Sequence, residues 1–169
     1  MRVPVAGGAA HKLAELPRGI LALHGKTLFA ASYSTGALVA IDTDTGKSRV
    51  IARGLPRPTA LAADATHLYV YCERDQTLRR IDATSGAVTE LAKGLVNSDN
   101  IALDGNYVYT RTWGAKPDLV RIVKDGSRPL EILDDVKAPS DIAIDADAVY
   151  VTSRGGNAIV RLEKSALAP

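Results

Sequence analysis

The sequence contains very few of the residues on which several classes of function depend. Cysteine, methionine, tryptophan and phenylalanine occur only once each in 169 residues. With a single cysteine the chain has no internal disulfide, and the apolar surroundings of Cys72 in "HLYVYCE" predict a buried, inert thiol. Because aromatic rings other than tyrosine are so scarce, a stacking platform for single-stranded nucleic acid is not expected.

Charge of one sign and long apolar runs are missing as well. There are 21 basic and 19 acidic residues, and the basic ones are scattered singly, which predicts neither a nucleic-acid nor a membrane partner. No run approaches the roughly 18 consecutive apolar residues of a membrane span, and "MRVPVAGGAAHKL" lacks the apolar centre of a signal peptide. The composition, 46% apolar and 24% charged, is that of an ordinary globular domain.

What the chain does contain is one pattern written four times. An alanine with apolar neighbours recurs at steps of 40, 40 and 41 residues, and an aromatic residue follows seven positions after each alanine. The alanines are Ala22, Ala62, Ala102 and Ala143, and the aromatics are Phe29, Tyr69, Tyr109 and Tyr150. Each copy carries short alternating segments separated by turn sequences such as "DGN" and "DATSG", which indicates antiparallel strands. Four strands in a repeat of about 40 residues are typical of a β-propeller blade.

The apolar residues of the repeat have a structural interpretation. Both faces of a blade pack on neighbouring blades, so both faces need apolar side chains. We expect the first strand of each copy to lie innermost, where its small alanine lets neighbouring sheets approach. The aromatic residue of the second strand then fills the wider space further out, as part of the core.

We predict a single all-β propeller domain with four blades of about 40 residues. The N-terminal "MRVPVAGGAAHKLAEL" aligns with "LVRIVKDGSRPLEIL" of the third copy, so it reads as the last two strands of a blade. Strand exchange between the two termini would then complete the closing blade. The predicted parts are 1–16 (last two strands of the closing blade), 17–54, 55–94 and 95–135 (whole blades), and 136–169 (first three strands of the closing blade).

Closure of the ring has three solutions. One chain can close alone with four blades, two chains can pair head to tail into an eight-bladed ring, or the chain can be a segment of a longer propeller. An unclosed stack would expose two apolar faces, which favours aggregation. We favour a ring closed by self-association, because a head-to-tail contact that closes by symmetry forms no filament.

The repeats resemble those of known bacterial propellers. "MRVPVAGG" and "IALDGNYVYT" are similar to repeats of large myxobacterial propellers of the secreted or lipoprotein type. "PSDIAID" and "AVYVTSRGGNAIVRLE" resemble NHL and SMP-30-like propeller repeats. The resemblance implies an extracellular or envelope protein, of which this chain would be a fragment or half-propeller. Its motifs are structural, so it indicates fold far more strongly than function.

Candidate binding residues lie in the loops that vary between copies. These loops join the fourth strand to the next first strand ("GLPRPT", "GLVNSDN") and the second strand to the third ("ERDQT", "WGAKPD"). Loops on a rigid scaffold are where binding concentrates, and an amphipathic aromatic at a rim suits a protein or sugar contact. An alternative is that the tryptophan covers the edge of its own blade. The candidates are Trp113, Arg111, Arg154, Asp99, Asn100, Asp141, Tyr33 and Glu73.

A metal site has only weak support. Asp99, Asn100 and Asp141 could hold a hard cation through oxygens, as calcium is held in SMP-30-like enzymes, but residues that cap turns explain the same letters. His24 and His67 flank turns on the opposite side of the blades, where they share no cleft with acidic partners. We therefore predict no metal, no cofactor and no catalytic residue.

The expected function is that of a non-catalytic scaffold or binding module. It would contact a small molecule or protein through the variable loops and would also associate with itself. One alternative is a metal-dependent channel enzyme of the lactonase or lyase type. The other is a purely structural propeller fragment, natural or engineered.

Overall fold

The computed structural model describes residues 7, 9–15, 18–114 and 116–167, and these residues form fifteen strands in four antiparallel sheets and no helix. The first sheet contains β1 (Gly19–His24), β2 (Thr27–Ser32), β3 (Leu38–Asp42) and β4 (Ser48–Ala52). The second contains β5 (Pro58–Ala63), β6 (His67–Cys72), β7 (Thr77–Asp82) and β8 (Val88–Lys93). The third contains β9 (Ile101–Leu103), β10 (Tyr107–Arg111), β11 (Leu119–Val123) and β12 (Glu131–Leu133). The fourth contains β13 (Pro139–Ile144), β14 (Ala148–Ser153) and β15 (Ala158–Glu163).

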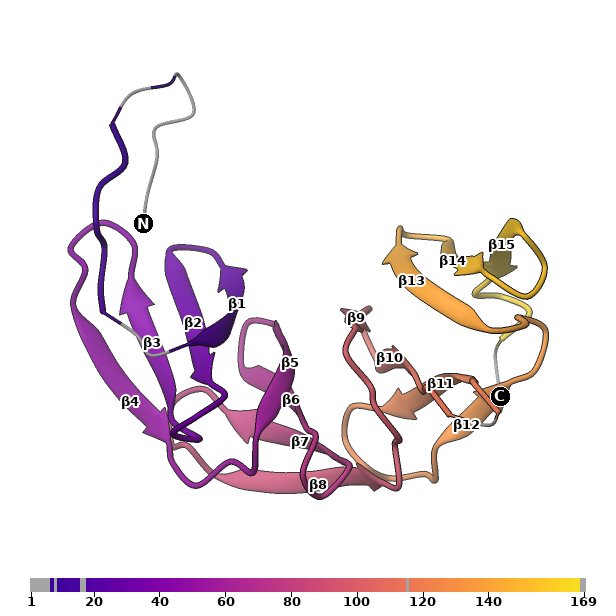
Figure 1. The fold of residues 1–169 in the computed structure, drawn as a ribbon, viewed down its shortest axis with the longest axis horizontal. Coiled ribbons are helices and arrows are strands. Elements are labelled where there is room, and N and C mark those ends of the chain that lie inside the picture. The colour runs from indigo at the N-terminus through magenta and orange to yellow at the C-terminus, as the bar shows by residue number, and fades with distance from the viewer. Residues whose placement is uncertain (1–6, 8, 16–17, 115, 168–169) are drawn as a thin grey trace.

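The sheets stand side by side along an open arc (Figure 1). The first strand of each sheet, β1, β5, β9 and β13, lies on the concave side, and β1 contacts β5, β5 contacts β9, and β9 contacts β13. The last strands β4, β8 and β12 follow the convex side (Figure 1). The expected all-β fold with its innermost first strands is therefore confirmed, in a propeller-like arrangement.

The repeated alanine and the repeated aromatic meet in every sheet. They are directly opposite each other on the first and second strands, in the same register each time. The pairs are Ala22 with Phe29, Ala62 with Tyr69, Ala102 with Tyr109, and Ala143 with Tyr150. Directly opposite residues point to the same face of a sheet, so each small side chain leaves room beside a ring. The forty-residue period of the sequence is thus a period in space.

Three apolar cores separate the four sheets. The first lies between the first and second sheets and includes Phe29, Leu38 and Val70. The second includes Tyr71 and Val120, and the third includes Tyr109 and Val149. Because every interior sheet is covered on both faces, its strands are apolar on both sides, as the sequence predicted.

Polar contacts cross between the same sheets. In the second, third and fourth sheets, an aspartate lies in the turn between the first and second strands. Its Oδ1 accepts two backbone N–H groups, and its Oδ2 accepts a tyrosine hydroxyl. The tyrosine pairs are Tyr69 with Asp64 (3.1 Å), Tyr109 with Asp104 (3.2 Å) and Tyr150 with Asp145 (2.9 Å). A lysine of the following sheet reaches the first two of these carboxylates. Lys124 lies 3.0 Å from Asp64, and Lys164 lies 3.5 Å from Asp104.

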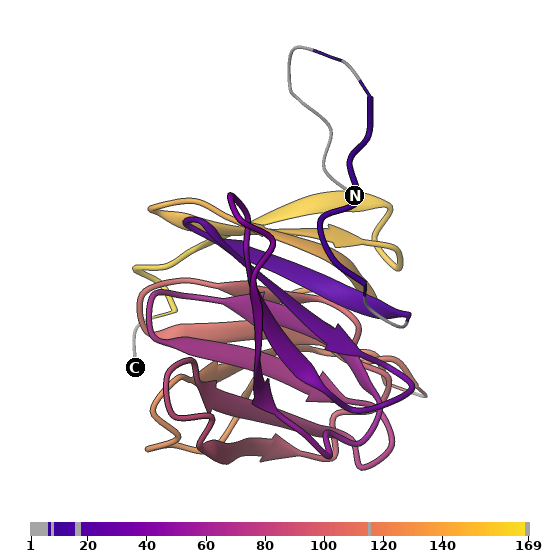
Figure 2. The same ribbon diagram turned by 90° about the vertical axis from the view of Figure 1, so that its left-hand side faces the viewer.

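The two ends of the arc do not meet in this structure. The first sheet and the fourth sheet lie at opposite ends of it, and the turned view shows the described N-terminal residues leaving along the first sheet (Figures 1 and 2). The predicted strand exchange falls partly on residues 1–6, 8 and 16, which lie outside the described residues. Within residues 7 and 9–15, no strand pairs with β15, and the fourth sheet has three strands.

Candidate functional site

The candidate residues lie on one side of the arc, which we call the loop face. It is formed by the loop residues 33–37, 73–76, 112–114, 116–118 and 154–157, by the connections that enter β5, β9 and β13, and by Arg18 before β1. A backbone hydrogen bond fixes the start of each of these loops to a neighbouring connection. The bonds are Tyr33 N–H to Arg18 O (3.1 Å), Glu73 N–H to Arg57 O (2.9 Å), Trp113 N–H to Val96 O (2.8 Å) and Arg154 N–H to Ala138 O (3.0 Å).

Trp113 contacts two arginines. The guanidinium carbon of Arg111 is 4.3 Å from the centre of the indole ring, and that of Arg154 is 5.2 Å from it. Arg111 ends β10 in the third sheet, and Arg154 follows β14 in the fourth, so the ring joins two sheets at the rim. Contacts of cations with an indole face stabilise such an arrangement and hold the ring in one orientation.

Arg111 is the most deeply buried member of this group. Its side chain is 8% exposed, and its Nη2 forms an ion pair with Asp99. Within the described residues, its Nε and Nη1 are buried without a hydrogen-bond partner, and Thr59 Oγ1 shares that condition. Buried donors without partners cost free energy. Such donors are therefore expected at sites where a ligand or water completes the hydrogen bonding.

A cavity of about 430 Å³ lies beside Trp113, between the second and third sheets. This size suits a small ligand. Its polar lining combines amide, hydroxyl and carboxylate groups with the indole. The lining residues are Thr59, Glu73, Asn97, Ser98, Asp99 and Trp113.

A second arginine–aromatic pair lies further along the loop face. The guanidinium of Arg57 stacks 4.5 Å from the ring centre of Tyr33 and lies 3.2 Å from a carboxylate oxygen of Glu73. Sequence reasoning named Tyr33 and Glu73 but missed Arg57. Its signal was a lone arginine between two prolines in "LPRP", where the backbone adopts a φ of 61°.

The structure brings the weak metal candidates together only in part. Asn100 donates its side-chain amide to Asp141, whose same oxygen also accepts the N–H of Ile142 at 3.0 Å. Asp99 is instead paired with Arg111. Among the described residues, no three histidine, cysteine or acidic side chains gather in a way that could hold a metal ion.

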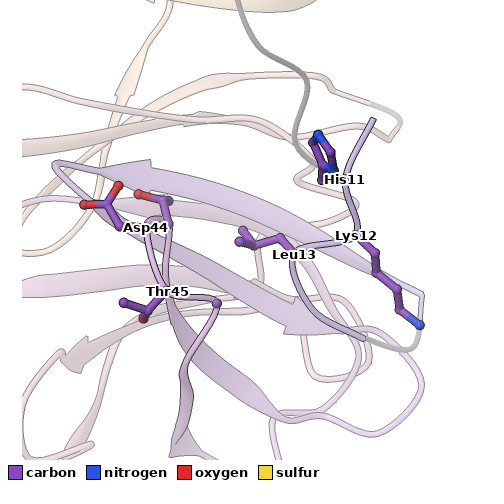
Figure 3. Close-up of a pocket in the computed structure, with 7 residues that line it drawn as sticks. His11, Lys12, Leu13, Asp44 and Thr45 are labelled. Atoms are coloured by element: carbon purple, nitrogen blue, oxygen red, sulfur yellow. The ribbon is translucent and has the colours of Figure 1, made fainter. Parts of the chain in front are cut away.

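Another cavity of about 430 Å³ lies away from the loop face, beside the turn between β3 and β4 (Figure 3). His11, Lys12 and Leu13 line it from the N-terminal segment, and Asp44 and Thr45 line it from the turn. Figure 3 shows Leu13 directed toward the turn and Lys12 directed away from it. This cavity belongs to the packing of the N-terminal segment on the first sheet.

Comparison with solved structures finds the same arrangement of sheets in other proteins. A chain of the nidogen/laminin complex matches with a TM-score of 0.68 and 15% identity, over 88% of this chain and 60% of that one. The computationally designed Ika4 protein matches with a TM-score of 0.64 and 13% identity, over 92% of this chain and 99% of that one. The chain thus spans about three-fifths of the nidogen/laminin chain. At these identities the likeness shows a β-propeller-like fold alone.

By sequence, the chain matches no family model and no curated protein. The resemblance to NHL, SMP-30-like and myxobacterial repeats therefore stays a prediction. In the part of the chain that the structure describes, no helix has the length and apolar character needed to cross a membrane.

Proposed function

We propose that the chain is a non-catalytic scaffold and binding module of the propeller type, which holds a small polar ligand or a protein through its loop face. The observation that carries this proposal is the indole of Trp113, held in contact with Arg111 and Arg154 beside a cavity of about 430 Å³. A large amphipathic ring already held in place loses little entropy on binding. The likeness to a chain of a nidogen/laminin complex fits a binding role, and the likeness to a designed protein fits a scaffold.

The proposal includes the absence of catalysis. Support comes from the engagement of the polar candidates with one another: Asp99 with Arg111, and Asn100 with Asp141. The alternative, a metal-dependent channel enzyme, needs oxygen ligands free to converge on an ion. Elemental analysis of the purified protein, together with melting in added calcium, separates the two. Stoichiometric metal, or a calcium-dependent rise in melting temperature, would favour the enzyme.

We further propose that the sheets act as blades of a ring that copies of the chain close by self-association. Leu21 and Leu23 of β1 and Ile159 of β15 are among the exposed large apolar side chains, and they lie at the two ends of the arc. Exposed apolar surface of this kind marks an interaction site on a stable protein. An extracellular or envelope location also stays a proposal, supported by the repeat resemblance.

Trp113 is the only tryptophan, so its fluorescence reports directly on the proposed site. We expect its emission to shift on titration with at least one member of a panel of oligosaccharides, carboxylic acids and amino acids. Arg154→Ala should weaken that response, whereas His11→Ala, at the cavity beside the β3–β4 turn, should leave it unchanged. Binding that responds to the second variant and not to the first would place the ligand elsewhere.

A further inference from the structure

The fourth sheet ends the arc with a face that every other sheet buries. In the first three sheets, one position of the third strand holds a leucine with 0% exposure, because the next sheet covers it. These leucines are Leu38, Leu78 and Leu119. The same position in β15 is Ile159, which is 74% exposed. We call this face, which also carries Tyr150 and Arg161, the trailing face.

The first sheet begins the arc with the complementary face. Leu21 of β1 is 60% exposed, whereas its equivalent in the fourth sheet, Ile142, is buried against the third sheet. Leu23 is exposed in the same way, and its equivalents Leu103 and Ile144 are partly buried within cores. We call this surface of the first sheet the leading face.

Polar bonds that cross every interior contact stop at the trailing face. In each of the first three sheets an arginine donates to a backbone carbonyl that follows the third strand of the next sheet, at the first residue after it in two sheets and the fourth residue after it in the last. The bonds are Arg49 to Ala83 O, Arg80 to Lys124 O, and Arg121 to Leu167 O. Arg161, the equivalent of Arg80 and Arg121, folds back onto the hydroxyl of Tyr150 in its own sheet, at 3.2 Å.

The N-terminal segment already lies where the outer strand of a preceding sheet would lie. The glycine in the turn before each last strand packs beneath one apolar residue from the sheet before it. The pairs are Gly86 with Ile51 of β4, Gly126 with Leu91 of β8, and Gly46 with Leu13. Leu13 therefore occupies, over the first sheet, the place that the outermost strand of a preceding sheet takes in the interior contacts, and the described residues form no such preceding sheet.

We infer that the N-terminal segment of one copy is the missing fourth strand of the C-terminal sheet of a second copy, so that two copies close head to tail into one ring. The inference rests on the self-association proposed above and names its surfaces. The trailing face of one copy would cover the leading face of the other, where the segment around Leu13 is already in position beside it. Two such contacts, related by a two-fold axis, leave neither face exposed.

The register of this exchanged strand follows from the interior sheets. In all three four-stranded sheets, the buried leucine of the third strand lies opposite a residue of the last strand. That residue directly follows the one that covers the turn glycine of the next sheet, or that holds the equivalent position. The pairs are Leu38 with Ala52, Leu78 with Ala92, and Leu119 with Leu133. The residue after Leu13 is Ala14, so Ala14 of one copy should oppose Ile159 of the other.

A disulfide tests that pair. Directly opposite residues of antiparallel strands have Cα atoms about 4.5–5.5 Å apart, within the reach of a disulfide. We expect the double variant Ala14→Cys/Ile159→Cys to become a covalent dimer on mild oxidation. The control His11→Cys/Ile159→Cys, three residues out of register, should not. A disulfide formed within a single chain would overturn the two-copy arrangement, and no disulfide in either variant would overturn the register.

Association variants test the faces without a crosslink. Leu21→Asp and Ile159→Asp should each give monomers, since each spoils both contacts of the ring. An equimolar mixture should form dimers again, at least about tenfold more readily than either alone, because one contact then joins an intact leading face to an intact trailing face. Val88→Asp changes an exposed residue of β8, in an interior sheet that belongs to neither end face, and should leave dimers intact. Circular dichroism confirms that each variant is folded.

The outcomes separate this inference from the proposed function. If the unchanged protein is a monomer, self-association itself fails. If it is a dimer that only Leu21→Asp disrupts, the copies meet through two leading faces, and the head-to-tail inference fails alone. Binding at Trp113 is read independently by its fluorescence in all of these variants.

Discussion

Lys124 of the third sheet contacts Asp64 of the second, with Nζ of the lysine 3.0 Å from Oδ2 of the aspartate. Both side chains are mostly buried, and Asp64 also accepts the hydroxyl of Tyr69. We expect Lys124→Met to lower the free energy of unfolding by about 1–2 kcal/mol, because the carboxylate stays charged and loses a charged donor. Urea denaturation measures this loss.

The matched control for that variant is Lys93→Met, at an exposed position of β8. It should change the free energy of unfolding by less than about 0.5 kcal/mol. Equal losses in the two variants would mean that the bond between the second and third sheets adds nothing to stability.

Asp64 also predicts how stability depends on acid. Burial opposes its ionisation, but the donated bonds of Lys124, Thr66 and His67 prevail and hold the pKa of Asp64 well below its ordinary value. A folded-state pKa below the unfolded one adds stability that is complete above about pH 4 and is lost as pH falls further. Asp64→Asn should therefore be less stable than the wild type at neutral pH and lose less stability below about pH 4. Parallel pH profiles in urea melts would contradict this.

Substitution of the turn glycine Gly86 should lower the free energy of unfolding for two separable reasons. Its φ is 74°, and a Cβ atom there would collide with the carbonyl oxygen of Ile51 in the preceding sheet. Gly94 has a φ of 77° and nothing within 4 Å of its Cβ position. Gly94→Ala should cost about 1 kcal/mol from backbone strain alone. Gly86→Ala should cost about 1–3 kcal/mol more, and equal costs by urea denaturation would show that this sheet contact is loose.

Cys72 should be unreactive in the folded protein. Burial raises the pKa of its thiol to about 11, and the nearby Arg79 only partly offsets this. A disulfide reagent reacts with thiolate, so at about pH 8 the folded protein should react far more slowly than the protein in concentrated guanidinium. Rapid reaction of the folded protein would contradict the burial of β6.

The periodic residues allowed the strands and their order to be predicted from the sequence. Ala62 and Tyr69 lie seven apart, which is the spacing that a hairpin between them needs to bring both to one face. The period could not locate Arg57, because its contacts with Tyr33 and Glu73 depend on how two neighbouring sheets are placed. Arg111 was predicted as a binding candidate of the loop face, and the sequence did not indicate that its side chain, at the end of β10, is only 8% exposed and paired with Asp99.

For a similar reason, the sequence alone could not indicate which sheet the N-terminal segment joins. An alignment of "MRVPVAGGAAHKLAEL" with the third copy indicates a strand, but not whose sheet it joins. The packing of Leu13 over Gly46, on the first sheet, is the observation on which our inference about that sheet rests.

The most direct test of the proposed self-association is the mass of the unchanged protein in solution. Light scattering at micromolar concentration measures it. The account predicts a discrete particle of twice the 17.9 kDa of one chain. A stable monomer would contradict it.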